Sequence, residues 1–165
     1  MNLLRILKHL LYPDWIVRRA FPAPVMARIE AAIAASEAGH RGEIRFAVEA
    51  SLALRPLLTG QSARERAVEV FSELRVWDTE ENNGVLIYLL LADHDVEIVA
   101  DRGVSQALPP DYWAEVCRSM EAHFRAGRYA DGVLAGVAEI GRRLTELYPR
   151  TGADVNELPD RPVRL

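Results

Sequence analysis

Three acidic side chains, Asp78, Glu80 and Asp101, have the type and the placement in the chain that could do chemistry. Carboxylate oxygens are the hard ligands that Ca²⁺ and Mg²⁺ prefer, and two small residues, Gly84 and Gly103, lie beside them in the sequence. The spacing is not that of an EF-hand loop. We therefore predict a weak site for Ca²⁺ or Mg²⁺ at these three carboxylates. The alternative is that they are solvated and serve turns and helix caps.

Two segments must form the strands that position this site. Residues 85–92 carry no charge and lie between an Asn-Asn-Gly turn signal and Asp-His-Asp, which predicts a central strand buried on both faces. In residues 96–101 apolar and acidic side chains alternate, so we expect a second strand that folds back antiparallel to the first. Together they predict a hairpin with one buried arm and one half-exposed arm.

A third strand is predicted at residues 43–49, where apolar and charged side chains also alternate. A helix follows it, and Ser62 with Glu65 forms the capping box that begins this helix. A strand, a helix and another strand form a crossover unit, so this strand should run parallel to residues 85–92. The starts of both strands, Asp101 and the loop at 78–82 then meet at one end of the sheet.

The other polar groups of the sequence indicate no catalytic centre. Asp93, His94 and Asp95 follow one another at the hairpin tip, where consecutive side chains point in different directions, so we interpret them as a hydrophilic turn. Ser62 is better explained as a cap than as a nucleophile, and the chain has neither a phosphate-binding glycine loop nor a Gly-x-Ser-x-Gly motif. A hydrolytic function would need the predicted carboxylate cluster to hold a metal ion that activates water or clamps a phosphoryl group. We favour a non-catalytic role and keep a phosphatase as the alternative.

Composition narrows the class of protein. The 165 residues have the length of one domain, and half of them are hydrophobic. The net charge of -4 argues against a nucleic-acid partner, which normally meets a basic surface. The single Cys117 excludes an internal disulfide. No apolar run reaches the roughly 18 to 20 residues that span a bilayer, and the start of the chain lacks the features of a secretion signal, so we expect a cytoplasmic protein.

The two ends of the chain differ from its middle. Leucines recur at helical spacing in residues 2–11, with basic side chains on the remaining face, which predicts a short amphipathic helix. It either docks on this domain or on a copy of it, or it contacts a membrane surface. We assign residues 1–21 to this helix and a linker, 22–149 to an α/β domain, and 150–165, which contain two prolines and little apolar pattern, to a mobile tail.

Several pieces of the domain, in this order, resemble the TPM domain, also called the TPM phosphatase family. They are the buried strand after Asn-Gly, the Val-Glu-Ile strand that ends in Asp-Arg-Gly, Trp113, Phe124, the Gly-Arg-Tyr turn at 127–129 and the Asp-Gly pair at 131–132. The likeness covers roughly residues 40–149. It implies an α/β sandwich with a small mixed sheet between helices, in agreement with the strand pattern.

The resemblance also implies two competing functions. Some members of the family are described as acid phosphatases, and others look like non-catalytic modules that bind divalent cations or membrane-protein partners. The usual relatives carry a secretion signal and a membrane segment, which this sequence lacks, so it looks like a soluble branch. Asp78 and Asp101 fall where the family's acidic loop positions are expected, and only these two are carried over.

Overall fold

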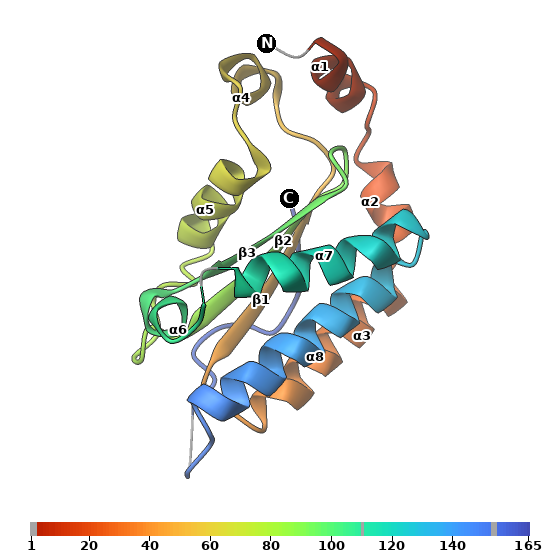
Figure 1. Ribbon diagram of the computed structural model, residues 1–165. Coiled ribbons are helices and arrows are strands. Elements are labelled where there is room, and N and C mark those ends of the chain that lie inside the picture. The colour runs from red at the N-terminus through yellow and green to blue at the C-terminus, as the bar shows by residue number, and fades with distance from the viewer. Residues whose placement is uncertain (1–2, 110, 153–154) are drawn as a thin grey trace.

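A four-stranded mixed sheet lies at the centre of the computed structural model, which describes residues 3–109, 111–152 and 155–165 (Figure 1). The strands are β1 (Glu43–Glu49), β2 (Gly84–Leu90), β3 (Asp95–Ala100) and β4 (Val163–Arg164), in the order β3-β2-β1-β4. β1 runs parallel to β2 and to β4, and β3 runs antiparallel to β2. Every residue of β2 is buried. The predicted α/β fold with a buried central strand is therefore confirmed.

The crossover between β1 and β2 covers one face of the sheet with α5 (Ala63–Glu73). The predicted capping box begins this helix, because the Ser62 hydroxyl accepts from the Glu65 amide and the Glu65 carboxylate accepts from the Ser62 amide. The segment that precedes α5 contains the short helix α4 (Leu54–Thr59). Its buried Leu57 holds it to the domain, and it ends at Gly60, whose φ of 80° lies in the left-handed region that glycine adopts readily.

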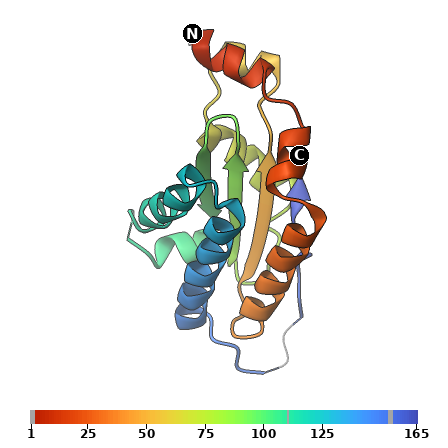
Figure 2. The same cartoon turned by 90° about the vertical axis from the view of Figure 1, so that its right-hand side faces the viewer.

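Three longer helices pack on the other face of the sheet (Figure 2). They are α3 (Ala23–Glu37), α7 (Tyr112–Arg125) and α8 (Tyr129–Leu147), and the short helices α2 (Trp15–Ala20) and α6 (Arg102–Gln106) connect to them. A Cβ added at Gly136 would lie 2.5 Å from the sulfur of Met120, and one at Gly132 would lie 2.5 Å from the Phe124 ring. The glycines of α8 therefore provide the close approach to α7 that their spacing predicts.

The C-terminal segment differs from the mobile tail that we expected. β4 extends the sheet beside β1, Leu158 is buried, and the Glu43 carboxylate accepts hydrogen bonds from the Glu157 and Leu158 amides at 3.0 and 3.2 Å. Most of this attachment uses backbone groups and a distant carboxylate, so the segment needs no apolar pattern of its own.

The N-terminal helix α1 (Leu3–Leu10) lies at the end of the sheet where β2 ends and β3 begins, because its Arg5 and His9 bond to Asp93. No helix in the described ranges is both long and apolar enough to cross a bilayer.

Candidate functional site

The predicted site lies where β1 and β2 begin and β3 ends. The register pairs Glu43 with Gly84 and Val85 with Ala100, so these three strand ends lie side by side. The Asp101 amide donates to the Gly84 carbonyl at 2.8 Å, which fixes the residue directly after β3 at the same end. The antiparallel hairpin of β2 and β3 that the sequence predicts therefore brings Asp101 to the loop that precedes β2, and the parallel pairing places the start of β1 beside it. We call residues 78–83 together with Asp101 the acidic edge.

The loop of the acidic edge is held by its own hydrogen bonds. Thr79 is buried, and its hydroxyl accepts from the Asn83 amide at 3.1 Å. Asn82 has a φ of 53°, and its carbonyl accepts from the Gly103 amide at 3.0 Å. A Cβ on Gly103 would lie 2.7 Å from that carbonyl oxygen and 2.8 Å from the carbonyl oxygen of Glu81. The loop and the first turn of α6 thus approach each other closely because Gly103 has no side chain.

Asp101 has one carboxylate oxygen in use and one without a partner. Its Oδ1 accepts from the Arg102 amide at 2.6 Å, which caps α6. Its Oδ2 is buried and has no hydrogen-bond partner in the described structure. A buried acceptor without a donor carries a free-energy penalty of about 1–3 kcal/mol, more for a charged group. Among the three predicted ligands, this oxygen is therefore the buried acceptor that lacks a donor in the described structure.

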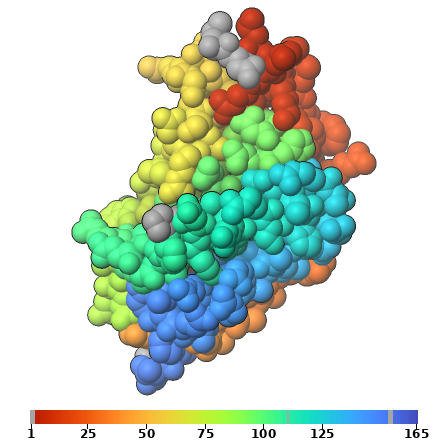
Figure 3. All heavy atoms as spheres, in the orientation of Figure 1, coloured from red at the N-terminus to blue at the C-terminus, as the bar shows by residue number. Residues whose placement is uncertain are grey.

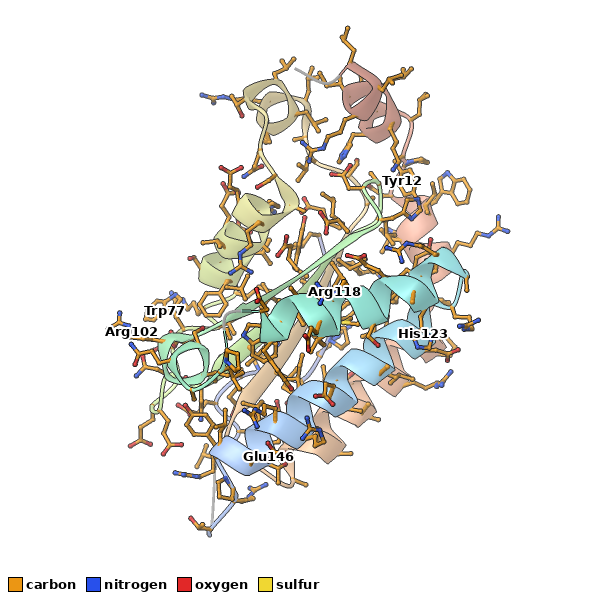
Figure 4. The ribbon with its side chains drawn as sticks, viewed as in Figure 1. Tyr12, Trp77, Arg102, Arg118, His123 and Glu146 are labelled. Carbon is orange, nitrogen blue, oxygen red and sulfur yellow. The ribbon has the colours of Figure 1, made fainter. Side chains whose placement is uncertain are left out.

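The other two predicted ligands lie on the same loop but point into solvent. The side chains of Asp78 and Glu80 are exposed, and the Glu80 amide donates to the Glu157 carboxylate at 2.9 Å. Trp77 and Arg102, labelled in Figure 4, lie on the outside of the molecule at this end. Within the described residues, no three His, Cys, Asp or Glu side chains form a group that could hold a metal ion as positioned. Of the three predicted ligands, only Asp101 has a buried carboxylate oxygen without a hydrogen-bond partner in the described structure.

Two residues beside the acidic edge were not predicted from the sequence. Arg41 forms an ion pair with Glu81 and accepts a hydrogen bond from the Asn83 side chain through its carbonyl at 2.8 Å. The Tyr148 hydroxyl lies beside Gly103, and burial, followed by the charges of Glu81 and Asp101, raises the pKa of this phenol. Both residues come from other parts of the chain, so no local spacing could have indicated them.

Buried carboxylates behind the acidic edge serve the fold. Glu37 accepts from the Ile44 amide at 2.8 Å, and Glu43 binds the two C-terminal amides described above. Burial raises the pKa of Glu37 to about 9, against the Ile44 hydrogen bond, and nearby Glu43 and Asp160 raise it further. Burial likewise raises the pKa of Glu43. Both carboxylates accept hydrogen bonds from backbone amides.

Ser36 and His40, which no motif in the sequence indicated as a pair, lie within hydrogen-bonding distance of each other. Ser36 Oγ is 3.0 Å from His40 Nε2, the separation expected of a nucleophile and its base. The serine oxygen, however, would lie 1.8 Å from a Cβ on Gly141, so the hydroxyl is pressed against α8. The serine hydroxyl therefore packs where α3 approaches α8, at a place that Gly141 leaves open by having no side chain.

The Asp-His-Asp triplet contributes to a second ionic group at the opposite end of the sheet. Asp93 accepts from Arg5 Nη2 at 2.8 Å and from His9 Nε2 at 2.9 Å. His9 Nδ1 accepts from the Leu52 amide at 3.0 Å, so the ring proton must be on Nε2. Both ring nitrogens of His9 are occupied, so this imidazole holds structural contacts at both of its nitrogens. We call Arg5, His9 and Asp93 the Asp93 cluster, and its role is to attach α1.

Comparison with known proteins places this architecture in a family. The TPM domain family model matches residues 20–143. The fold is similar to the NMR structure of the BA42 protein from the psychrophilic bacterium Bizionia argentinensis, with 27% identity and a TM-score of 0.77, over 87% of this chain and 94% of that one. It is also similar to the N-terminal domain of a P. gingivalis protein, with 17% identity and a TM-score of 0.62, over 86% and 95% of the two chains. No curated protein matches.

Proposed function

Since this chain belongs to the TPM domain family, we propose that it acts as a non-catalytic binding module whose acidic edge takes up a weakly held Ca²⁺ or Mg²⁺. The observation that carries this proposal is the buried Asp101 Oδ2, which has no hydrogen-bond partner in the described structure. A divalent cation would satisfy this oxygen, and oxygen ligands are the ones that both ions require. The ion would tie α6 to the loop before β2.

The conformation of the loop at residues 78–82 explains why the proposed site should bind Ca²⁺ or Mg²⁺ weakly. Asp78 and Glu80 are exposed and can supply further oxygens only after residues 78–82 change conformation. Part of the binding free energy is then used to reorder the loop, which weakens the site. A millimolar dissociation constant is the range of comparable low-affinity calcium sites, about 10⁻⁴–10⁻³ M. The module would therefore respond to changes in the concentration of an abundant ion.

A non-catalytic role is supported by the places of the nucleophiles and bases. Ser36 is pressed against α8, and both nitrogens of His9 are occupied. Burial, followed by the charge of Glu97, raises the pKa of the Cys117 thiol to about 12, so at neutral pH the sulfur is protonated and weakly nucleophilic. Each of these groups stabilises the fold instead of facing a substrate.

Thermal unfolding with and without ions tests the cation site. At about 10 mM Ca²⁺ or Mg²⁺ and a Kd of about 1 mM, a ligand that binds only the native state adds about 1.4 kcal/mol of stability. This corresponds to a melting temperature about 3–6 °C higher for a domain of this size. Asp101→Asn should remove the shift while keeping the cap of α6, because the Asn side-chain oxygen also accepts from the Arg102 amide.

The matched control is Asp14→Asn, an exposed aspartate near the opposite end that makes no side-chain cap. It should keep the full shift. An equal shift in both variants would assign the effect to general screening of charge and refute the site. The alternative function, a metal-assisted phosphatase, uses the same carboxylates. It requires hydrolysis of a phosphate monoester by the purified protein, lost in both Asp78→Asn and Asp101→Asn with the fold intact.

A further inference from the structure

α1 is attached to the domain by its polar face. Its Arg5 and His9 side chains point inward to Asp93, and Arg5 Nη1 also donates to the Gln61 carbonyl at 2.7 Å. His9 is buried and holds the Leu52 amide as well. An amphipathic helix that docks on its own domain normally turns its apolar face inward. In α1, Arg5, His9 and the half-buried Ile6 face the domain, and the leucines face away from it.

The apolar face of α1 is consequently presented to the outside. Five leucines on this face are 54–79% exposed: Leu3, Leu4, Leu7, Leu10 and Leu11. The neighbouring helix α4 adds Leu54 and Leu58, one turn apart and about half exposed, and Trp15 at the start of α2 is 57% exposed. α1 and α4 form one end of the molecule (Figure 3). We call these eight apolar side chains the leucine tip.

The charge around the leucine tip is opposite to that of the rest of the chain. Residues 1–20 contain four Arg or Lys and one Asp, a net charge of +3 in a chain whose total is -4. The basic side chains of Lys8, Arg18, Arg19 and Arg55 are exposed. Exposed leucines and a tryptophan flanked by basic groups are the composition that binds the surface of an anionic bilayer.

We propose that the leucine tip binds the surface of a bilayer that contains anionic lipids. The leucines and Trp15 would enter the boundary between headgroups and acyl chains, and the exposed basic side chains would contact lipid phosphates. A second copy of this chain is a poorer occupant, because facing tips would bring two groups with a charge of +3 together. The Asp93 cluster has a clear role in this arrangement: it holds α1 with its apolar face outward.

Vesicle cosedimentation of the full chain tests the proposal. The protein should bind vesicles of phosphatidylcholine with 30% phosphatidylglycerol, chosen as probes, and bind pure phosphatidylcholine far more weakly. The double variant Leu4→Gln, Leu7→Gln should reduce partitioning into anionic vesicles at least about tenfold, because each side chain loses the transfer of its apolar surface. Both positions are exposed, so the fold should not change.

The matched control is Val68→Gln with Trp77→Gln, two exposed apolar residues on and after α5, away from the tip. This variant should bind like the unmodified protein. A second variant, Arg18→Gln with Arg19→Gln, should lower binding to anionic vesicles about tenfold or more and leave the weak binding to phosphatidylcholine unchanged. High salt should have the same effect as the arginine substitutions.

Three results would overturn the proposal: no binding to anionic vesicles, equal binding by the leucine and control variants, or a dimer in sedimentation velocity that the leucine substitutions dissociate while vesicle binding is absent. Asp101→Asn is expected to bind vesicles normally. The proposal therefore stands or fails separately from the cation site.

Discussion

The two ends of the sheet use carboxylates in opposite ways. At the leucine tip, Asp93 has both oxygens paired, and its partners turn the polar face of a helix inward. At the acidic edge, Asp101 has one oxygen in a helix cap and the other buried without a partner in the described structure. The fully paired Asp93 stabilises an attachment, whereas Asp101 keeps one buried acceptor without a donor, which is the observation behind the proposed cation site. The partners of an acidic residue, more than its spacing in the sequence, therefore decide its role.

The largest effect is expected from breaking the packing behind the acidic edge. A Cβ on Gly84 would lie 2.0 Å from the Val76 carbonyl oxygen, a backbone atom that cannot move alone. Gly84→Ala should therefore lower the free energy of unfolding by about 3 kcal/mol, as expected for severe overpacking. Urea unfolding measures this loss. Gly152→Ala, where no atom lies within 4 Å of the added Cβ, should change stability by less than about 0.5 kcal/mol; a similar loss in both would contradict the packing.

Removing the Asp93 carboxylate, at the α1 end of the sheet, should have the next largest effect on stability. Asp93→Ala leaves the buried His9 Nε2–H without its acceptor and should cost about 2 kcal/mol. Hydrogen exchange should show the loss concentrated in α1, since a helix of eight residues is not stable alone. Asp14→Ala is the control and should leave α1 protected. Unchanged exchange in α1 of the Asp93 variant would show that other contacts hold the helix.

The Asp93 cluster should also respond to pH. Burial favours the neutral acid, but the hydrogen bonds from Arg5 and His9 outweigh it and hold the pKa of Asp93 below its usual 3.8. The native state therefore favours the ionised form more than the unfolded state does. The resulting stabilisation is complete above pH 3.8 and is lost as the pH falls through the lowered native pKa. In acid, α1 should exchange faster than the strands of the sheet.

A smaller effect on stability is expected at Glu37, behind the acidic edge. Its dependence on pH is opposite in sign to that of Asp93. Its native pKa of about 9 is raised from an ordinary 4.5, so between these values the native state holds a proton that the unfolded state has lost. Stability should fall as pH rises through this window. Glu37→Gln keeps the acceptor for the Ile44 amide without the titration and should stabilise the protein at pH 7 by about 1 kcal/mol, allowing for partial solvation.

Chemical unfolding at pH 4 and pH 7 checks this prediction, since the benefit of Glu37→Gln should shrink at pH 4. Glu30→Gln, an exposed glutamate on the same helix, should show no such difference. A Glu37→Gln variant that is less stable than the unmodified protein at pH 7 would mean that the ionised carboxylate is the native form.

Local patterns predicted the features that depend on neighbours in the chain. The uncharged run of β2 and the capping box of Ser62 and Glu65 each appear in the structure as predicted. Burial of a strand and capping of a helix are determined largely by side chains within a few residues of one another. The parallel pairing of β1 and β2 followed because a helix of this length in a crossover leaves few other topologies.

The sequence alone therefore determined the central sheet, the family and the end of the sheet at which Asp101 lies. Only the tertiary structure decided which face of α1 is buried. Its Arg5 and His9 bond to Asp93, which lies more than 80 residues away in the sequence. The attachment of β4 depends in the same way on Glu43, more than 110 residues distant. Periodicity records which side chains share a helix face, whereas the burial of that face depends on the partner that the fold brings to it.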